Sequence, residues 1–221
     1  MSYTKQDASR PKPQSLREKQ KEDRRNRISV AMMELLSTKS ADDITNGEIA
    51  ERAGVTIPTI YNLIGGRSDI LVHLLNKVMA DLRVGYLAEK ELNPLDRAER
   101  VGAFLVGRFT SQEEAYRQVI RGVNSVPLPS LKPYETSPHR IYLELMREAE
   151  AERAFVTGIG AVHVANLLFQ IFAGALITWA IEGLTKAEFS AQVTDGFHVI
   201  VAAVCTDTHR KFALQKLKSK K

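Results

Sequence analysis

The run of residues 45–71 constrains the fold of this 221-residue chain more than any other stretch. Thr45, followed three residues later by Glu48, has the pattern of a capping box, and Gly54 is typical of a helix end. Thr56 can then cap a second short helix. Two short helices joined by a tight turn that contains glycine predict a helix-turn-helix.

The second of these helices is too short and too polar on one side to serve the core alone. Ile60 points inward in this pattern, while Ile57, Pro58 and Asn62 fall on the outer side. Such a helix suits the major groove of DNA. Asparagine can bond to adenine through two hydrogen bonds, and Ile57 and Pro58 can pack on a thymine methyl group, although both could equally be ordinary surface residues.

The run resembles the DNA-binding motif of the TetR family of bacterial transcriptional regulators. That family's pattern is roughly T-x-x-x-I-A-x-x-A-G-V-S-x-x-T-L-Y-x-H-F-x-S-K-x-x-L, and the agreeing residues are Thr45, Ile49, Ala50, Ala53, Gly54, Val55, Thr59, Tyr61 and Leu71. Close substitutes stand at Thr56, Ile60 and Arg67. Departures stand at Leu63, Ile64 and Gly66, and the first leaves one phosphate contact of the family without its usual histidine.

The resemblance implies an all-α protein of about nine helices, with a three-helix DNA-binding domain followed by a helical domain for ligand binding and dimerisation. We expect a flexible basic extension at 1–16, the DNA-binding domain at 17–66, the effector-binding and dimerisation domain at 67–210 and a basic tail at 211–221. By resemblance, the contacts to the DNA backbone fall at Thr45, Thr56, Thr59, Tyr61 and Arg67. Tyr61 could instead be a partly buried anchor of its helix.

The charge of the chain is concentrated at its ends. Residues 1–27 hold nine Lys or Arg and four Asp or Glu, and residues 210–221 hold six cations and no acid. Because the whole chain carries +5, the residues between are net −6. We expect the N-terminal arm, with Arg24, Arg25 and Arg27 at the start of the first helix, to contact phosphates, and the tail to be solvated and disordered.

Residues 159–181 form an apolar run that is hydrophobic almost all round, and a second apolar helix follows a short link. One small subunit can hardly cover such a helix, so a second subunit is implied. The predicted interface comprises Gly160, Val164, Leu167, Ile171, Phe189, Val193, Phe197, Ile200 and Val204. A membrane span is the rival interpretation, and it is disfavoured by polar residues at 163, 166 and 170 on one face.

The family places an effector pocket among the middle helices of the C-terminal domain. Candidates are Phe104, Arg108, Phe109, Tyr116, Tyr142, Met146, His163, Asn166, Gln170 and Trp179. Apolar walls with a few polar groups suit a mostly hydrophobic small molecule. Aromatic residues at helical spacing also occur simply in a core, and the three polar candidates of 163–170 could hydrogen-bond across a dimer seam instead.

No nucleophile elbow, glycine-rich phosphate loop or metal-ligand spacing is present, so we expect no catalytic residue, no metal and no cofactor. A single cysteine and a polar N-terminus predict a cytoplasmic protein. The expected partners are double-stranded DNA, a second copy of the chain and a small-molecule effector, but no membrane. The resemblance implies repression at a near-palindromic operator, relieved by the effector. A DNA-binding dimer without an effector stays open, and an enzyme on an all-α scaffold is disfavoured.

Overall fold

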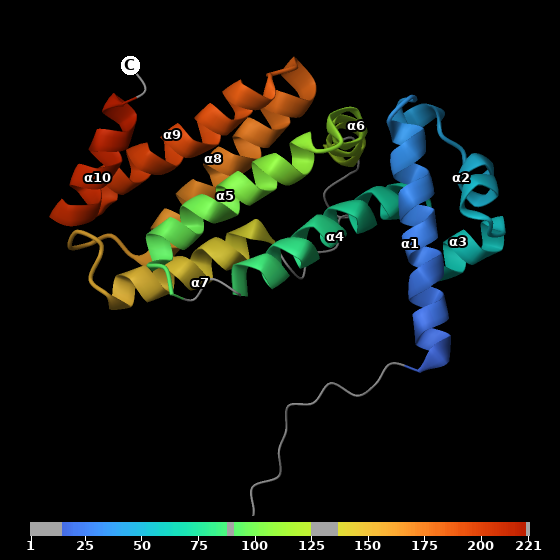
Figure 1. Cartoon of the computed structure of the whole chain (residues 1–221), viewed down its shortest axis with the longest axis horizontal. Helices are drawn as coiled ribbons and strands as arrows, with labels where there is room; N and C mark the ends of the chain where they lie inside the picture. Colours follow the sequence, from blue (N-terminus) through green and yellow to red (C-terminus); the bar gives the residue numbers. More distant parts are fainter. Residues whose placement is uncertain (1–14, 88–90, 125–136, 220–221) are drawn as a thin grey trace, which may run out of the picture.

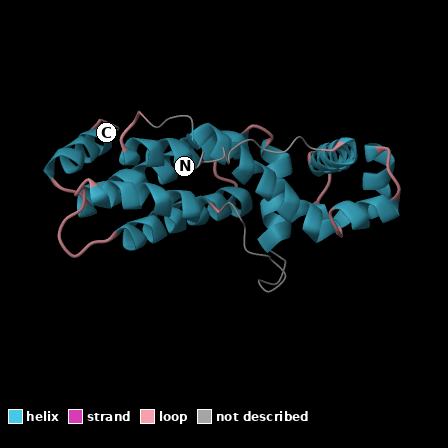
Figure 2. Ribbon diagram, turned by 90° about the horizontal axis from the view of Figure 1, so that it is seen from below, coloured by secondary structure: helices cyan, strands magenta, loops and turns pink. Residues whose placement is uncertain are grey.

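The computed structural model describes residues 15–87, 91–124 and 137–219. Within these ranges the chain forms ten α-helices, one 3₁₀ helix and no strand beyond an isolated bridge between Phe155 and Cys205, which confirms the all-α prediction. The elements are α1 (Leu16–Leu36), η1 (Ala41–Asp43), α2 (Asn46–Ala53), α3 (Ile57–Leu63), α4 (Arg67–Leu87), α5 (Pro94–Thr110), α6 (Glu113–Asn124), α7 (Pro138–Ala151), α8 (Ala161–Glu182), α9 (Lys186–Val204) and α10 (Asp207–Lys218). The molecule is elongated, with α1, α2 and α3 at one end and α10 at the other (Figures 1 and 2).

The head, residues 15–66, is built by the local signals that the sequence contains. The hydroxyl of Thr45 accepts the N–H of Glu48 at 3.2 Å, and the Glu48 carboxylate accepts the N–H of Thr45 at 2.9 Å. Gly54 ends α2 in the left-handed conformation, with φ of 62°, which favours glycine. Thr56 caps α3. The fully buried side chains of the head core are Ile28, Met32, Leu36, Ile44, Ile49 and Ile60.

The body consists of α5 to α10, and α4 joins it to the head (Figure 1). Gly183 ends α8 with φ of 80°, and Thr185 with Glu188 forms the predicted capping box of α9. The two helices pack closely, because a Cβ atom on Gly196 would lie 2.6 Å from Cγ2 of Ile171. Helices α5, α7 and α10 also pack against this pair.

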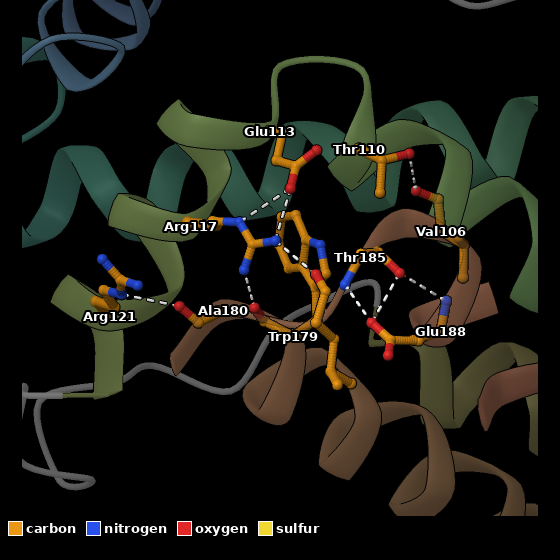
Figure 3. A network of polar contacts seen from close by, with 10 residues as sticks. Val106, Thr110, Glu113, Arg117, Arg121, Trp179, Ala180, Thr185 and Glu188 are labelled. Atoms are coloured by element: carbon orange, nitrogen blue, oxygen red, sulfur yellow. Dashed lines mark hydrogen bonds and ion pairs between the residues drawn. The ribbon is translucent and has the colours of Figure 1, made fainter. Parts of the chain in front are cut away.

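Helix α6 lies between the head and the α8–α9 pair (Figure 1) and packs against α1, η1, α4, α5 and α8. Its Arg117, 8% exposed, donates to the carbonyl oxygens of Trp179 and Leu184 and to the carboxylate of Glu113 (Figure 3). Arg121 donates to the carbonyl of Ala180 at 2.8 Å. The last carbonyls of an α-helix lack hydrogen-bond donors inside the helix. The two arginines of α6 supply donors to the carbonyls at the end of α8, where positive charge is also favourable.

One expectation about the ends of the chain is corrected, and the other falls largely on residues outside the described ranges. The expected disordered tail, residues 211–221, is helical through Lys218, since α10 packs on α9 with Ala213 fully buried. The expected extension, residues 1–16, lies outside the described residues except for Ser15 and Leu16, which cap and begin α1.

Candidate DNA-binding surface and ligand cavity

Helix α3 presents a solvent-facing side of unusual composition. Ile60 is fully buried and fixes the helix to the head, whereas Ile57 is 44% and Tyr61 55% exposed. Pro58 and Asn62 are exposed as well. Two large apolar or aromatic side chains on a seven-residue helix add little to the core in this position. Exposed apolar and aromatic side chains of this kind are typical of a surface that binds another molecule. The prediction that these residues lie on the outer side of the helix is confirmed.

Two arginines of α1 hold the ends of the helix-turn-helix. Arg25 donates through Nε to the carbonyl of Leu63 at 3.2 Å, and Arg27 donates through Nη1 to the carbonyl of Ala53 at 3.0 Å. They therefore bind the C-terminal carbonyls of α3 and α2, where a cation is favourable. Both were expected to contact DNA phosphates, and the structure gives them a positioning contact within the head that the sequence did not indicate.

Several of the residues expected at the DNA backbone are braced by neighbours. Arg67 donates to the backbone carbonyl of Asp42 at 2.7 Å and to its carboxylate at 3.1 Å. The Tyr61 hydroxyl accepts a hydrogen bond from Asn46 Nδ2 at 2.7 Å. The hydroxyls of Thr56 and Thr59 lie 2.9 Å apart. The side chains at the expected contact positions thus occupy defined orientations at the surface of the head.

The capping box of α2 contains a carboxylate, Glu48, that is stabilised in its ionised form. The Glu48 carboxylate bonds to Lys39 Nζ at 2.5 Å and to the backbone and hydroxyl of Thr45 at 2.9 Å. The hydrogen bond from Lys39, followed by those from Thr45, lowers the pKa of Glu48 to about 2. Glu48 is therefore ionised at neutral pH and holds Thr45 at the start of α2.

The body contains an apolar cavity of about 180 Å³ between α4, α5, α6, α7 and α8. Its described lining residues are Leu75, Met79, Phe109, Ile120, Val123, Ser137, Pro138, Phe169, Phe172, Ala173, Leu176 and Ile177. The rings of Phe109 and Phe172 lie 6.3 Å apart and tilted by 34°. Only Ser137 contributes a polar side chain among these residues.

Comparison with solved structures places this arrangement among known folds. A TetR transcriptional regulator from Rhodococcus sp. RHA1 superposes with a TM-score of 0.63 at 17% identity, covering 82% of this chain and 97% of that one. FadR of Thermus thermophilus, a TetR-family repressor solved with lauroyl-CoA, gives 0.63 at 17% identity, with 83% and 96% covered. NalD of Pseudomonas aeruginosa, the secondary repressor of the MexAB-OprM multidrug efflux pump, gives 0.61 at 18% identity, with 85% and 99% covered.

The chain has the TetR fold. No protein-family model matches the sequence, and no curated protein is significantly similar to it. The likeness at these identities concerns the fold, which agrees with the helical layout that the motif at 45–71 implied.

Of the ten pocket candidates, the structure brings only Phe109 to the cavity of this TetR fold. Phe104 is 37% exposed, and His163, Asn166 and Gln170 lie at the surface. The buried candidates Tyr116, Tyr142, Met146 and Trp179 fill the core without lining the cavity, and Arg108 lies over the Tyr116 ring at 5.3 Å. Burial raises the pKa of the Tyr142 phenol well above its usual range. These nine side chains do not line this cavity, because helical spacing does not say which neighbour each face meets, and Arg108 and Tyr116 line a separate hollow beside α1 instead.

The predicted dimer residues divide between core and surface. Those buried in the subunit's own core, none more than 7% exposed, are Val164, Phe189, Val193, Phe197, Ile200 and Val204. They face helices of the same chain, which distinguishes them from the other predicted interface residues. Leu167 is 45% exposed, and Gly160 and Ile171 are partly exposed.

One face of α8 nevertheless stays open to solvent. Helical spacing places three exposed apolar residues, Leu167, Ile177 and Ile181, on the same side as the polar residues of 163–170. Asn166 on this face bonds through Oδ1 to His139 Nε2 at 2.7 Å. By length and composition alone α8 is the one helix in the described ranges that is long and apolar enough to cross a membrane, a test that core helices also pass.

A second hollow, of about 530 Å³, lies between α1 and the α5–α6 turn. It is larger than the apolar cavity, but its charged walls are already paired. Lys77 bonds to Asn26 at 2.6 Å, Glu34 to Arg52 at 3.0 Å and Glu113 to Arg117 at 2.6 Å. These charged side chains are therefore less available to bind a ligand. Among the described residues, no group of three or more His, Cys, Asp or Glu side chains is placed to hold a metal ion.

Proposed function

We propose that this protein is a transcriptional regulator that binds a near-palindromic operator as a homodimer, represses there, and is released by a small, largely apolar effector. The observation that carries the proposal is the exposed side of α3, on which Ile57, Pro58, Tyr61 and Asn62 face solvent from a helix fixed by Ile60. The TetR fold supplies the setting for such a helix.

The chemistry of this surface fits double-stranded DNA. Hydroxyls and cations at Thr45, Thr56, Tyr61 and Arg67 suit phosphate oxygens. Asn62 suits an adenine edge in the major groove, and Ile57 suits a thymine methyl group. The bracing of Tyr61 by Asn46 and of Arg67 by Asp42 reduces the side-chain freedom that binding would otherwise remove.

Dimerisation is supported by the exposed face of α8. Leu167, Ile177 and Ile181 are between 42% and 53% exposed, although they belong to a helix that is otherwise part of the core. In a dimer with a two-fold axis, this face of α8 in one subunit would pack against the same face of α8 in the other. Two heads would then meet half-sites about one helical turn apart, roughly 34–36 Å, or a multiple of it.

An effector is supported by the apolar cavity, which lies next to α4, the helix that joins head and body. A ligand that binds one head spacing more tightly than the other shifts the equilibrium by that difference in affinity. Two of the similar structures are named as repressors, and one of these was solved with lauroyl-CoA. Repression with release by a ligand is the simplest arrangement that uses both the surface and the cavity.

The test is selection of bound sequences from random duplex DNA at about 0.15 M salt, where charge-only binding is weakened. The proposal predicts a two-fold symmetric motif. Recovery of unenriched DNA would contradict operator recognition. A screen of compounds for loss of binding to the selected duplex then separates an effector-controlled regulator from a dimer that answers to a protein partner or to none.

A further inference from the structure

The cavity in the body restricts the size of what it can hold. Its volume is about 180 Å³. An apolar cavity of about 150 Å³ stays dry and takes up a molecule such as benzene. The volume here therefore fits one six-membered ring with one or two further heavy atoms, and a larger ligand would extend through the open side at Ile177, which is 42% exposed.

The lining restricts the charge of the ligand. None of the described side chains around the cavity carries a charge, and five helices contribute aliphatic or aromatic carbon. A carboxylate or ammonium group would lose its hydration and find no opposite charge. The described walls thus favour an uncharged molecule.

The lining also indicates shape and polarity. Three phenylalanine rings, Phe109, Phe169 and Phe172, and the thioether of Met79 surround the space, and such groups contact the faces and edges of other rings favourably. Ser137 caps α7 by accepting the N–H of His139 at 3.2 Å. Since a hydroxyl can accept and donate at once, Ser137 can still offer one hydrogen bond to a ligand.

We propose that this cavity binds an uncharged molecule about the size of a single aromatic ring, carrying at most one polar group, which lies at Ser137. The inference deepens the proposed function by naming the chemical class of its effector, and it rests on that function only for the regulatory consequence of binding. The binding itself is a property of the cavity.

The experiment is isothermal titration of the purified full chain, without DNA, using toluene and its charged counterpart benzoate as probes. We expect saturable binding of toluene and at least about tenfold weaker binding of benzoate, since the latter must bury its charge. Ala173→Leu fills the cavity from α8 and should abolish toluene binding. Ala103→Leu makes the same change on the exposed side of α5 and should leave it intact.

Far-ultraviolet circular dichroism establishes that each variant folds, and Val123→Leu replaces Ala173→Leu should the latter fail to fold. Equal binding of toluene and benzoate, no binding of toluene, or unchanged binding in the filled variant would overturn the proposal. Adding toluene to the protein–operator complex is a separate measurement. Toluene that binds the cavity without releasing DNA supports the ligand class and counts against effector control, so the two failures are distinguishable.

Discussion

Replacing Arg117 by methionine tests whether α6 stabilises the body through the end of α8. Arg117 is 8% exposed, and its guanidinium donates to the carbonyls of Trp179 and Leu184 and lies 4.4 Å from the centre of the Trp179 ring. Methionine keeps much of the side-chain volume but leaves both carbonyls and the Glu113 carboxylate without this donor.

The magnitude follows from these contacts. Each hydrogen bond to a charged group contributes about 1.5–3 kcal/mol, and the contact with the ring about 0.5–2 kcal/mol. These contributions overlap, and loss of one partner of a buried charged network typically costs about 3–5 kcal/mol. We expect Arg117→Met to lower the free energy of unfolding by about that amount, which lowers the urea midpoint by about 1–2 M.

The assay is urea unfolding followed by far-ultraviolet circular dichroism, at one protein concentration because dimerisation would make stability depend on it. Arg121→Met is the matched control: Arg121 is exposed and makes one hydrogen bond to Ala180, so its loss should cost about 1 kcal/mol. Equal midpoints for the two variants would refute the account of Arg117.

Three further predictions concern the head. Tyr61→Ala should weaken operator binding while sedimentation still shows a dimer, and unchanged affinity would remove Tyr61 from the DNA-binding surface. Asn62→Ala should relax base preference at one position in each half-site by about 1–3 kcal/mol if Asn62 reads adenine, and an unaltered selected motif would exclude that role. The pKa of Glu48 is lowered from 4.5 to about 2, so its ionised form stabilises the head above pH 4.5 and this contribution is lost as the pH falls towards 2. Thermal unfolding should therefore show wild type more stable than Glu48→Ala at neutral pH, with the difference vanishing near pH 2; a difference independent of pH would contradict the role of the charge.

The features that the sequence predicted correctly depend on neighbours within four residues. Thr45 with Glu48 and Thr185 with Glu188 form capping boxes, and Gly54 and Gly183 end their helices, because each requires only its own helix terminus. The exposed side of α3 followed in the same way, once Ile60 was assigned to the core.

The cavity and the subunit surface could not be predicted in this way, because they depend on which helices meet. Phe189 and Phe197 belong to an apolar face that suggested a partner subunit, yet helices of the same chain cover them. Phe169 and Phe172 line the cavity although nothing in their spacing separates them from core residues. Helix α10 was missed because its apolar residues are few among its lysines, and its packing on α9 decides its structure.

The most direct test of the central claim, that α3 reads bases in the major groove of two half-sites, is methylation interference on the selected operator. Dimethyl sulfate modifies guanine at N7 in the major groove and adenine at N3 in the minor groove, so the pattern of interference identifies the groove that the protein reads. The account predicts that major-groove methylation prevents binding at two symmetric clusters, and that both clusters weaken in Asn62→Ala. Interference confined to the minor groove, or none at any position, would contradict it.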